Sequence, residues 1–308
     1  SKLICNFTNT NLFLMKIIKA KKTKVSEIDF QNLDFGSIFS DHMFSCSFVD
    51  GEWDEGTIEP YKPILMDPSA RTLHYGQACF EGMKAYKDNS GKPWLFRPIE
   101  NYKRIVKSCK RLAMPELPEK IFMDGVSKLV DLDKEWIKPG IGNSLYIRPF
   151  IFADQPSINA NEANQYKFMI ICAPAQLYYS GDMKVKIEKS FSRASKGGVG
   201  YAKAAGNYAA QFYPTMLARD EGYQQIIWTD SSNHEYIEEA GTMNLFFRIN
   251  DTLITTPTSD TILDGITRKS IIQLCKDSNI DIQIRKITVH ELKEAAKNKS
   301  LKEIFGTG

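Results

Sequence analysis

One lysine, Lys203, stands in a stretch of small residues, GGVGYAKAAGNY, which runs from Gly197 to Tyr208. Glycine and alanine on both sides remove bulk, so a flat ligand can approach the backbone closely. Small apolar neighbours also exclude water, and desolvation favours the neutral amine over the ammonium ion. A neutral lysine amine is a nucleophile that forms Schiff bases with carbonyl compounds. The stretch therefore predicts a Schiff-base lysine; a solvated surface charge is the alternative.

A carbonyl cofactor on Lys203 indicates pyridoxal phosphate, which needs an acidic partner at its ring nitrogen. Glu239, in the stretch EEAGTMNLFF, leads into a small-residue turn between two expected strands and suits that nitrogen, although adjacent glutamates are usually surface charge. The cofactor's phosphate needs the amides of a helix N-terminus and a cation. Ile266 and Thr267 open an expected helix, and Arg104 offers a forked guanidinium.

The chain also resembles a known family, the branched-chain amino acid aminotransferases of pyridoxal-phosphate fold type IV. Five blocks carry the resemblance: FGSIFSDHM, LHYGQACFEGMKAYK, GGVGYAKAAGNY, EEAGTMNLFF and LDGITRKSII. It extends from about residue 34 to residue 308 and implies a two-domain α+β fold like that of D-amino acid aminotransferase. We expect an N-terminal extension over residues 1–21, a small α+β domain over 22–177, a linker over 178–184 and a large cofactor-binding domain over 185–308.

The resemblance implies roles for individual residues. Lys203 binds the cofactor covalently, Glu239 contacts its pyridine nitrogen and Tyr208 hydrogen-bonds its phenolic oxygen. The remaining residues bind the phosphate or line the substrate pocket. The phosphate is held by Arg104 and by the amides of Ile266 and Thr267. The substrate pocket is lined by Phe35, Tyr75, Phe80, Tyr146, Tyr178, Thr242 and Met243.

Two further expectations concern anion binding. Arg148, in the stretch YIRPF, is the candidate for receiving the γ-carboxylate of glutamate, with a structural ion pair as the alternative. In the family, the glycine that matches Gly308 is followed by a threonine and an alanine that bind the substrate carboxylate and contact the phosphate. We therefore expect the C-terminus to be incomplete; the alternative is that half of this anion-binding group is missing.

The implied activity is transfer of the amino group of leucine, isoleucine or valine to 2-oxoglutarate. A D-amino acid aminotransferase or an aminodeoxychorismate lyase of the same fold would share Lys203 and Glu239, but the blocks FEGMKAYK and FGSIFSDHM argue against both. A non-catalytic pyridoxal-phosphate-binding protein is the alternative from another class. Family members are dimers in which a loop of one subunit completes the other's pocket, and the corresponding loop in this chain is Pro156 to Ala160.

Composition excludes other classes of function. Forty basic and 37 acidic side chains give a net charge of +3, which provides no electrostatic footprint for nucleic acid or a membrane. Six scattered cysteines without a C-x-x-C pair favour a reducing cytoplasm. Four dispersed histidines indicate no metal site, and no apolar run approaches the length of a membrane span.

Hydrophobic periodicity and turn residues predict the elements that must position these side chains. Residues 34–86 are predicted to consist of strands and turns. The expected helices cover residues 100–112, 121–136, the region after Lys203, 266–275 and 289–297. The expected strands cover residues 43–49, 64–66, 94–98, 145–152, 166–172, 185–187, 225–229, 236–237, 245–247 and 253–255.

Overall fold

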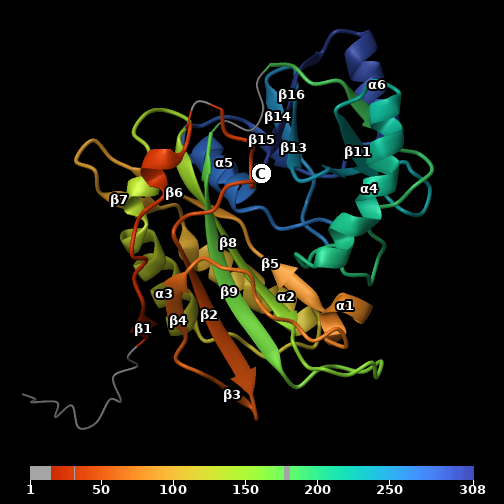
Figure 1. Ribbon diagram of the computed structural model, residues 1–308. Helices are drawn as coiled ribbons and strands as arrows, with labels where there is room; N and C mark the ends of the chain where they lie inside the picture. Colours follow the sequence, from red (N-terminus) through yellow and green to blue (C-terminus); the bar gives the residue numbers. More distant parts are fainter. Residues whose placement is uncertain (1–14, 31, 177–180) are drawn as a thin grey trace, which may run out of the picture.

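The computed structural model describes residues 15–30, 32–176 and 181–308 (Figure 1). The described residues of the first half form a nine-stranded sheet with the path β1-β4-β2-β9-β8-β6-β7, to which β3 adds beside β2 and β5 beside β8. The strands are β1 (Lys16–Ile17), β2 (His42–Val49), β3 (Glu52–Trp53), β4 (Thr57–Pro60), β5 (Ala78–Phe80), β6 (Met83–Lys87), β7 (Pro93–Leu95), β8 (Ser144–Ala153) and β9 (Tyr166–Ala175). Apart from the parallel pair β1 and β4, neighbouring strands in this sheet are antiparallel.

One face of this sheet is covered by helices. The helical elements of the first half are η1 (Val25–Glu27), α1 (Arg71–Tyr75), α2 (Pro98–Arg111), α3 (Glu119–Leu132) and η2 (Lys134–Trp136). The Phe168 ring of β9 packs against both Phe122 of α3 and Phe44 of β2, and all three side chains are fully buried. Successive side chains of a strand point to opposite faces. In β8, therefore, Leu145 and Ile147 face this core, and the alternate residues face the other side of the sheet.

The second half of the chain contains two smaller sheets and three helices. The first sheet has β10 (Val185–Ile187), β11 (Gln225–Thr229) and β12 (Ile237–Ala240), and the second has β13 (Asn244–Ile249), β14 (Thr252–Thr255), β15 (Ile282–Ile284) and β16 (Leu301–Thr307). The helices are α4 (Ala205–Asp220), α5 (Ile266–Asp277) and α6 (Val289–Lys297). Strand β11 is buried on both faces: Trp228 belongs to a cluster with Ala218 of α4, and Ile227 belongs to a cluster with Leu292 of α6. Within the described part of the chain, none of the helices has the length and hydropathy needed to cross a bilayer.

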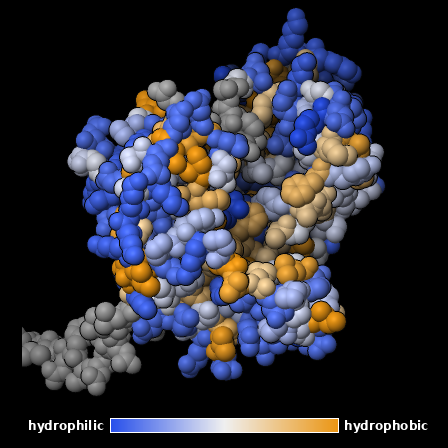
Figure 2. All heavy atoms as spheres, viewed as in Figure 1, coloured by the Kyte–Doolittle hydropathy of each residue, from blue (hydrophilic) through white to orange (hydrophobic). Residues whose placement is uncertain are grey.

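Backbone contacts beside Lys203 and a side-chain hydrogen bond farther away join the two halves of the chain. The amide of Phe80, at the end of β5, donates to the Lys203 carbonyl at 3.1 Å, and Cys79 forms an isolated bridge with Ala204. Farther along, Arg97 donates to the Ser270 hydroxyl of α5 at 2.7 Å. The molecular surface is hollowed between the part that carries the large sheet and α4 (Figure 2). The functional residues of both halves therefore meet at one junction.

Most expected elements are present, and two expectations are wrong. Residues 64–66 form no strand, because Pro63 lacks an amide donor and Leu65, at 98% exposure, has no sheet to cover it. Residues 34–86, which are predicted to consist of strands and turns, contain the helix α1. This helix has five residues and is too short to show hydrophobic periodicity. The fold also adds β1, which pairs with β4, so residues 16 and 17 of the expected extension belong to the large sheet.

Candidate active site

Lys203 lies immediately before α4, at the junction of the two halves. Its amide donates to the Ser108 hydroxyl of α2 at 2.9 Å, and its carbonyl accepts from Phe80, so its backbone is fixed from two sides. Its Nζ donates to the Tyr208 hydroxyl at 2.7 Å. The Phe80 ring lies 5.0 Å from the same nitrogen and 4.8 Å from the Tyr208 ring. The lysine amine is thus held between a phenol and an aromatic face.

Gly200, which lines the pocket, also has a packing role. A Cβ at Gly200 would lie 2.8 Å from both the Asp260 carbonyl oxygen and the Thr261 Cα. The turn is therefore pressed against the loop before α5, and a larger residue at position 200 would separate them. The Tyr201 amide donates to the Asp260 carbonyl at 3.0 Å, which fixes this contact. Glycine is needed here for the approach of two protein segments.

Glu239 of β12 is buried, with 4% of its surface exposed. Its Oε1 forms an ion pair with Nε of Arg193 at 2.9 Å, and its Oε2 accepts from the Leu263 amide at 3.0 Å and from Asn244 Nδ2 at 3.3 Å. Burial raises the pKa of Glu239 from 4.5 to about 7, while the charges of Arg193 and Lys203 and the Leu263 hydrogen bond act in the opposite direction. The carboxyl is therefore poised to change its charge near neutral pH.

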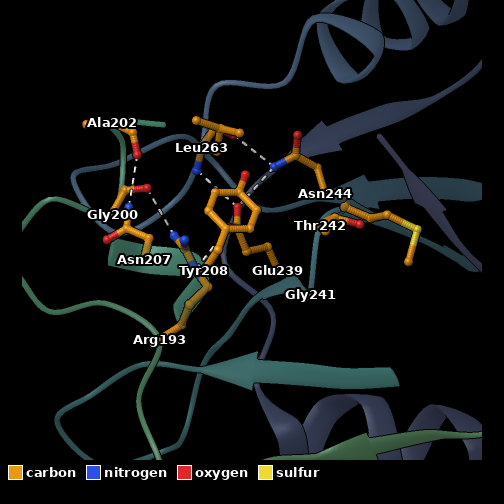
Figure 3. Close-up of a pocket in the computed structure, with 11 residues that line it drawn as sticks. Arg193, Gly200, Ala202, Asn207, Tyr208, Glu239, Gly241, Thr242, Asn244 and Leu263 are labelled. Carbon is orange, nitrogen blue, oxygen red and sulfur yellow. Dashed lines mark hydrogen bonds and ion pairs between the residues drawn. The ribbon is translucent and has the colours of Figure 1, made fainter. Parts of the chain in front are cut away.

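Glu239, Gly200 and Tyr208, the hydrogen-bond partner of Lys203, line one pocket (Figure 3). It is a hollow that is open to solvent and is lined by both polar and apolar residues. Its lining includes Arg193, Gly200, Ala202, Asn207, Tyr208, Glu239, Gly241, Thr242, Met243, Asn244 and Leu263. We call Arg193, Lys203, Tyr208 and Glu239 the charged end of the site.

A candidate anion site lies at the start of α5. Helix α5 begins after Gly265, and among the described residues no side chain caps its first turn, so the amides of Ile266 and Thr267 are available to a ligand. Arg104 reaches this helix from α2, since its Nη1 donates to the Asp264 carbonyl at 3.1 Å. Its Nε and Nη2 both donate to the Glu81 carboxylate, each at 2.7 Å. Glu81 thus orients the guanidinium, which retains further N–H groups for an anion.

A second group of residues lies beside the charged end on the large sheet. Tyr146 and Arg148 are alternate residues of β8 and project from the face opposite the helices. Arg148 Nη2 donates to the Tyr146 hydroxyl at 2.8 Å, and its guanidinium lies 4.4 Å from the Phe80 ring centre. Phe35 meets the Tyr146 ring edge-on at 5.0 Å. We call Phe35, Phe80, Tyr146 and Arg148 the aromatic end of the site.

Two predicted pocket residues do not join these groups. Tyr75 is half exposed at the end of α1, and its hydroxyl donates to the Ile158 carbonyl of the loop between β8 and β9. Tyr178 lies outside the described residues. Thr242 and Met243, by contrast, line the pocket from the turn between β12 and β13.

Sequence reasoning missed three polar residues of the pocket: Arg193, Asn207 and Asn244. Asn207 follows the lysine, and its Nδ2 donates to the Val199 and Ala202 carbonyls at 2.9 Å, which closes the turn. Asn244 belongs to the EEAGTMNLFF block, where a polar residue at the start of an apolar strand is a signal that could have found it. Nothing in the sequence around Arg193 distinguishes it from a surface arginine. Among the described residues, no three His, Cys, Asp or Glu side chains gather as metal ligands.

Known proteins are similar over most of the chain. The model of the family Amino-transferase class IV matches residues 78–299. A probable branched-chain-amino-acid aminotransferase of Staphylococcus epidermidis is 45% identical over 285 residues, which cover 91% of this chain and 79% of the relative. Branched-chain-amino-acid transaminase 1 of Bacillus subtilis is 41% identical over 300 residues, which cover 95% of this chain and 84% of the relative.

A solved structure is similar as well. The branched-chain amino acid aminotransferase from Escherichia coli has a TM-score of 0.68 and 26% sequence identity to this chain. The match covers 87% of this chain and 82% of that one. The α+β prediction is therefore confirmed by the architecture of a related protein.

Proposed function

The chain belongs to the class IV aminotransferases, and within them to the branched-chain amino acid aminotransferases, and from this premise we propose how its own residues carry out the transfer. It is a pyridoxal-phosphate-dependent transaminase that moves the amino group of leucine, isoleucine or valine to 2-oxoglutarate. One observation supports the assignment of the site most strongly. Tyr208, which pairs with Lys203, lines one pocket together with the buried Glu239 and with Leu263, which belongs to the loop that leads to the uncapped start of α5.

The groups present fit pyridoxal phosphate. An amine is available for its aldehyde at Lys203, a phenol for its oxygen at Tyr208 and a buried carboxylate for its ring nitrogen at Glu239. The uncapped amides of Ile266 and Thr267, with Arg104 beside them, suit its phosphate. When bound, this cofactor supplies a carbonyl for the substrate amine and a ring that stabilises negative charge at the α-carbon.

The chain supplies acid–base chemistry and orientation. Lys203 Nζ acts as the general base that removes the α-proton of the substrate and as the acid that returns a proton, and the Tyr208 hydroxyl orients that amine. With the cofactor bound, the Glu239 carboxylate would stabilise a proton on the ring nitrogen, and that proton would increase the ability of the ring to withdraw electrons. Three hydrogen-bonding or ion-pair contacts hold this carboxylate in place before the cofactor arrives.

The aromatic end explains how one pocket accepts two kinds of side chain. Phe35, Phe80 and Tyr146 offer apolar surface to leucine, isoleucine or valine, and burial of such surface is worth about 25 cal/mol per Å². Arg148 offers a cation to the γ-carboxylate of 2-oxoglutarate. Its Nε is buried without a hydrogen-bond partner among the described residues, which favours a ligand as its partner over the structural ion pair.

We infer further that the active form is a homodimer. Tyr75, at 46% exposure, is tied to the loop of Ile158, itself 67% exposed, and Leu73 beside them is 59% exposed. A cluster of exposed apolar side chains on one subunit suits contact with the active site of a second subunit. These exposed side chains support the proposal that the loop from Pro156 to Ala160 contributes to the pocket of the partner subunit. An active monomer in sedimentation experiments would contradict it.

The proposed domain division follows the sheets. Residues 22–177 contain most of the nine-stranded sheet and residues 185–308 contain both smaller sheets, so the proposed linker, residues 178–184, separates them in the sequence. A reducing cytoplasm remains the proposed compartment. It is supported by Cys46, Cys79, Cys109, Cys172 and Cys275, which are all free and buried.

A spectrum of the purified protein tests the function. Bound pyridoxal phosphate absorbs visible light, and addition of leucine should convert that band to the spectrum of the amine form, with release of the branched 2-oxo acid. Addition of 2-oxoglutarate should then restore the band. A band that responds to D-alanine but not to leucine would instead indicate a D-amino acid aminotransferase, and a band that responds to no amino acid would indicate a binding protein.

A further inference from the structure

Arg193 is a buried arginine that contacts three separate segments of the site. It lies between β10 and the glycine-rich turn, and 8% of its surface is exposed. Its Nε lies 2.9 Å from Glu239 Oε1, and its Nη2 donates to the carbonyls of Gly200, at 3.1 Å, and Thr261. One guanidinium therefore connects the buried acid, the turn that leads to the lysine and the loop that leads to α5 (Figure 3).

Each contact lies close to a residue of the proposed chemistry. Gly200 precedes Lys203 by three positions. Thr261 precedes Leu263 by two, and the amide of Leu263 donates to the other oxygen of Glu239 at 3.0 Å. A shift of the guanidinium would therefore move the acid, the lysine-bearing turn and this amide together.

We propose that Arg193 is a positioning residue that fixes Glu239 relative to the lysine-bearing turn and keeps its carboxylate ionised for the ring nitrogen of pyridoxal phosphate. The inference rests on the proposed function and adds to it a residue that acts through Glu239. The Nε–H of Arg193 is within ion-pair distance of Glu239 but is not aligned as a hydrogen bond. The attraction is therefore mainly electrostatic, and Oε1 retains the capacity to accept a proton from a ligand.

The charges around Glu239 explain why an arginine is needed. The titratable groups that face it are Arg193, Lys203 and Glu238, with the Tyr208 phenol across the pocket. Burial and the neighbouring Glu238 raise the pKa of Glu239, whereas Arg193 and Lys203 lower it. Once Lys203 is joined to a cofactor, its charge changes during the reaction, but an arginine stays protonated. Arg193 therefore provides the constant part of the opposing charge.

The test measures binding of pyridoxal phosphate to the cofactor-free protein as a function of pH, followed by quenching of tryptophan fluorescence. Loss of the guanidinium should raise the pKa of Glu239, so in Arg193→Gln the pH below which affinity falls should rise by about 1–3 units. Arg193→Lys keeps the charge without the forked geometry. It should keep the wild-type midpoint but bind the cofactor roughly tenfold more weakly at alkaline pH, because one ammonium does not reproduce the contacts of the fork.

Two further variants separate this role from a general structural one. Glu239→Gln should lose the pH dependence assigned to Glu239, and adding Arg193→Gln to it should then produce no additional shift of the midpoint. Arg285→Gln, which removes another arginine–glutamate pair in the same half of the chain, should bind the cofactor with the wild-type profile.

The possible outcomes test the role of Arg193 separately from the proposed function. A wild-type protein that does not bind pyridoxal phosphate would refute the proposed function. If the wild type binds it and Arg193→Gln keeps the wild-type midpoint, the inference is overturned. If circular dichroism shows that Arg193→Gln is unfolded, Arg193→Lys decides, and wild-type affinity at alkaline pH in that variant would overturn the inference.

Discussion

The charged end and the aromatic end of the site adjoin each other but are constructed in different ways. At the charged end, Glu239 and Arg193 are 4% and 8% exposed, and backbone groups from separate loops hold both. At the aromatic end, Phe35 is 41% exposed, and Tyr146 and Arg148 project from a regular strand of the large sheet. Phe80 contacts Arg148 within the aromatic end and also contacts Lys203 of the charged end.

The difference suits what each end is proposed to bind. Buried charges are costly unless they are paired and hydrogen-bonded, so the charged end needs many fixed partners that a permanently bound cofactor can use without rearrangement. The aromatic end must exchange substrates with and without a side-chain charge, and exposed rings beside one arginine allow this. Changes at the charged end should therefore abolish chemistry, whereas changes at the aromatic end should alter the choice of substrate.

The largest effect is expected at Lys203. Lys203→Ala should lower turnover by more than about 10⁴-fold, since general-base catalysis alone contributes about 10²–10⁴-fold and the covalent link to the cofactor is lost as well. Steady-state transfer from leucine to 2-oxoglutarate measures it. Lys196→Ala, an exposed lysine of the preceding loop, is the control and should keep wild-type turnover. Comparable turnover in the two variants would remove Lys203 from the mechanism.

The next effect concerns pH and Glu239. The folded, cofactor-free protein has a Glu239 pKa of about 7, against 4.5 for the ordinary carboxyl, so it binds this proton more tightly than the unfolded chain does. The contribution of this group to stability is therefore complete below about pH 4.5 and is lost as the pH rises to about 7, by an amount on the order of 3 kcal/mol.

Thermal unfolding of wild type and Glu239→Gln between pH 4 and 8 measures this contribution. The difference between the two unfolding curves should change through that window, because glutamine does not titrate. A constant difference at all pH values would show that the pKa of Glu239 is the same in the folded and the unfolded protein.

A smaller and selective effect is expected at Arg148. Hydrogen bonds to charged groups contribute about 1.5–3 kcal/mol, so Arg148→Ala should raise the KM for 2-oxoglutarate and glutamate by about 10- to 100-fold. The KM for leucine should change little. Arg219→Ala, on the exposed side of α4, provides the matched control. An equal rise in KM for leucine and glutamate would indicate that Arg148 supports the pocket without binding the γ-carboxylate.

The smallest effect is expected at Gly82. A methyl group here would overlap the Tyr146 hydroxyl, which pairs with Arg148, so Gly82→Ala should displace that ring and cost about 1–3 kcal/mol of stability. Gly206→Ala, where a methyl group meets open space in the first turn of α4, is the control and should not destabilise the protein. Unchanged thermal stability and substrate preference in Gly82→Ala would show that Tyr146 adjusts freely.

Much of this protein was predictable from local sequence. The elements that begin with clear signals, such as α5 after Gly265 and the buried strand β11, lie where periodicity and turn residues predicted them. Lys203 and Glu239 were recognised because each stands in an unusual local setting, an amine among small residues and an acid before a small-residue turn. Local composition and the resemblance therefore determined the family, the cofactor and the central candidates for the chemistry.

Tertiary structure alone decided how distant segments share one site. Glu81 orients Arg104 across 23 positions, and Arg193 meets Thr261 across 68, although neither arginine has a distinctive neighbourhood in the sequence. Periodicity reports whether a side chain faces a core, but it does not report which other segment lies there. The partner of a buried charge is chosen by the packing of whole sheets and loops, and for that reason the contacts that hold Glu239 became visible only in the folded chain.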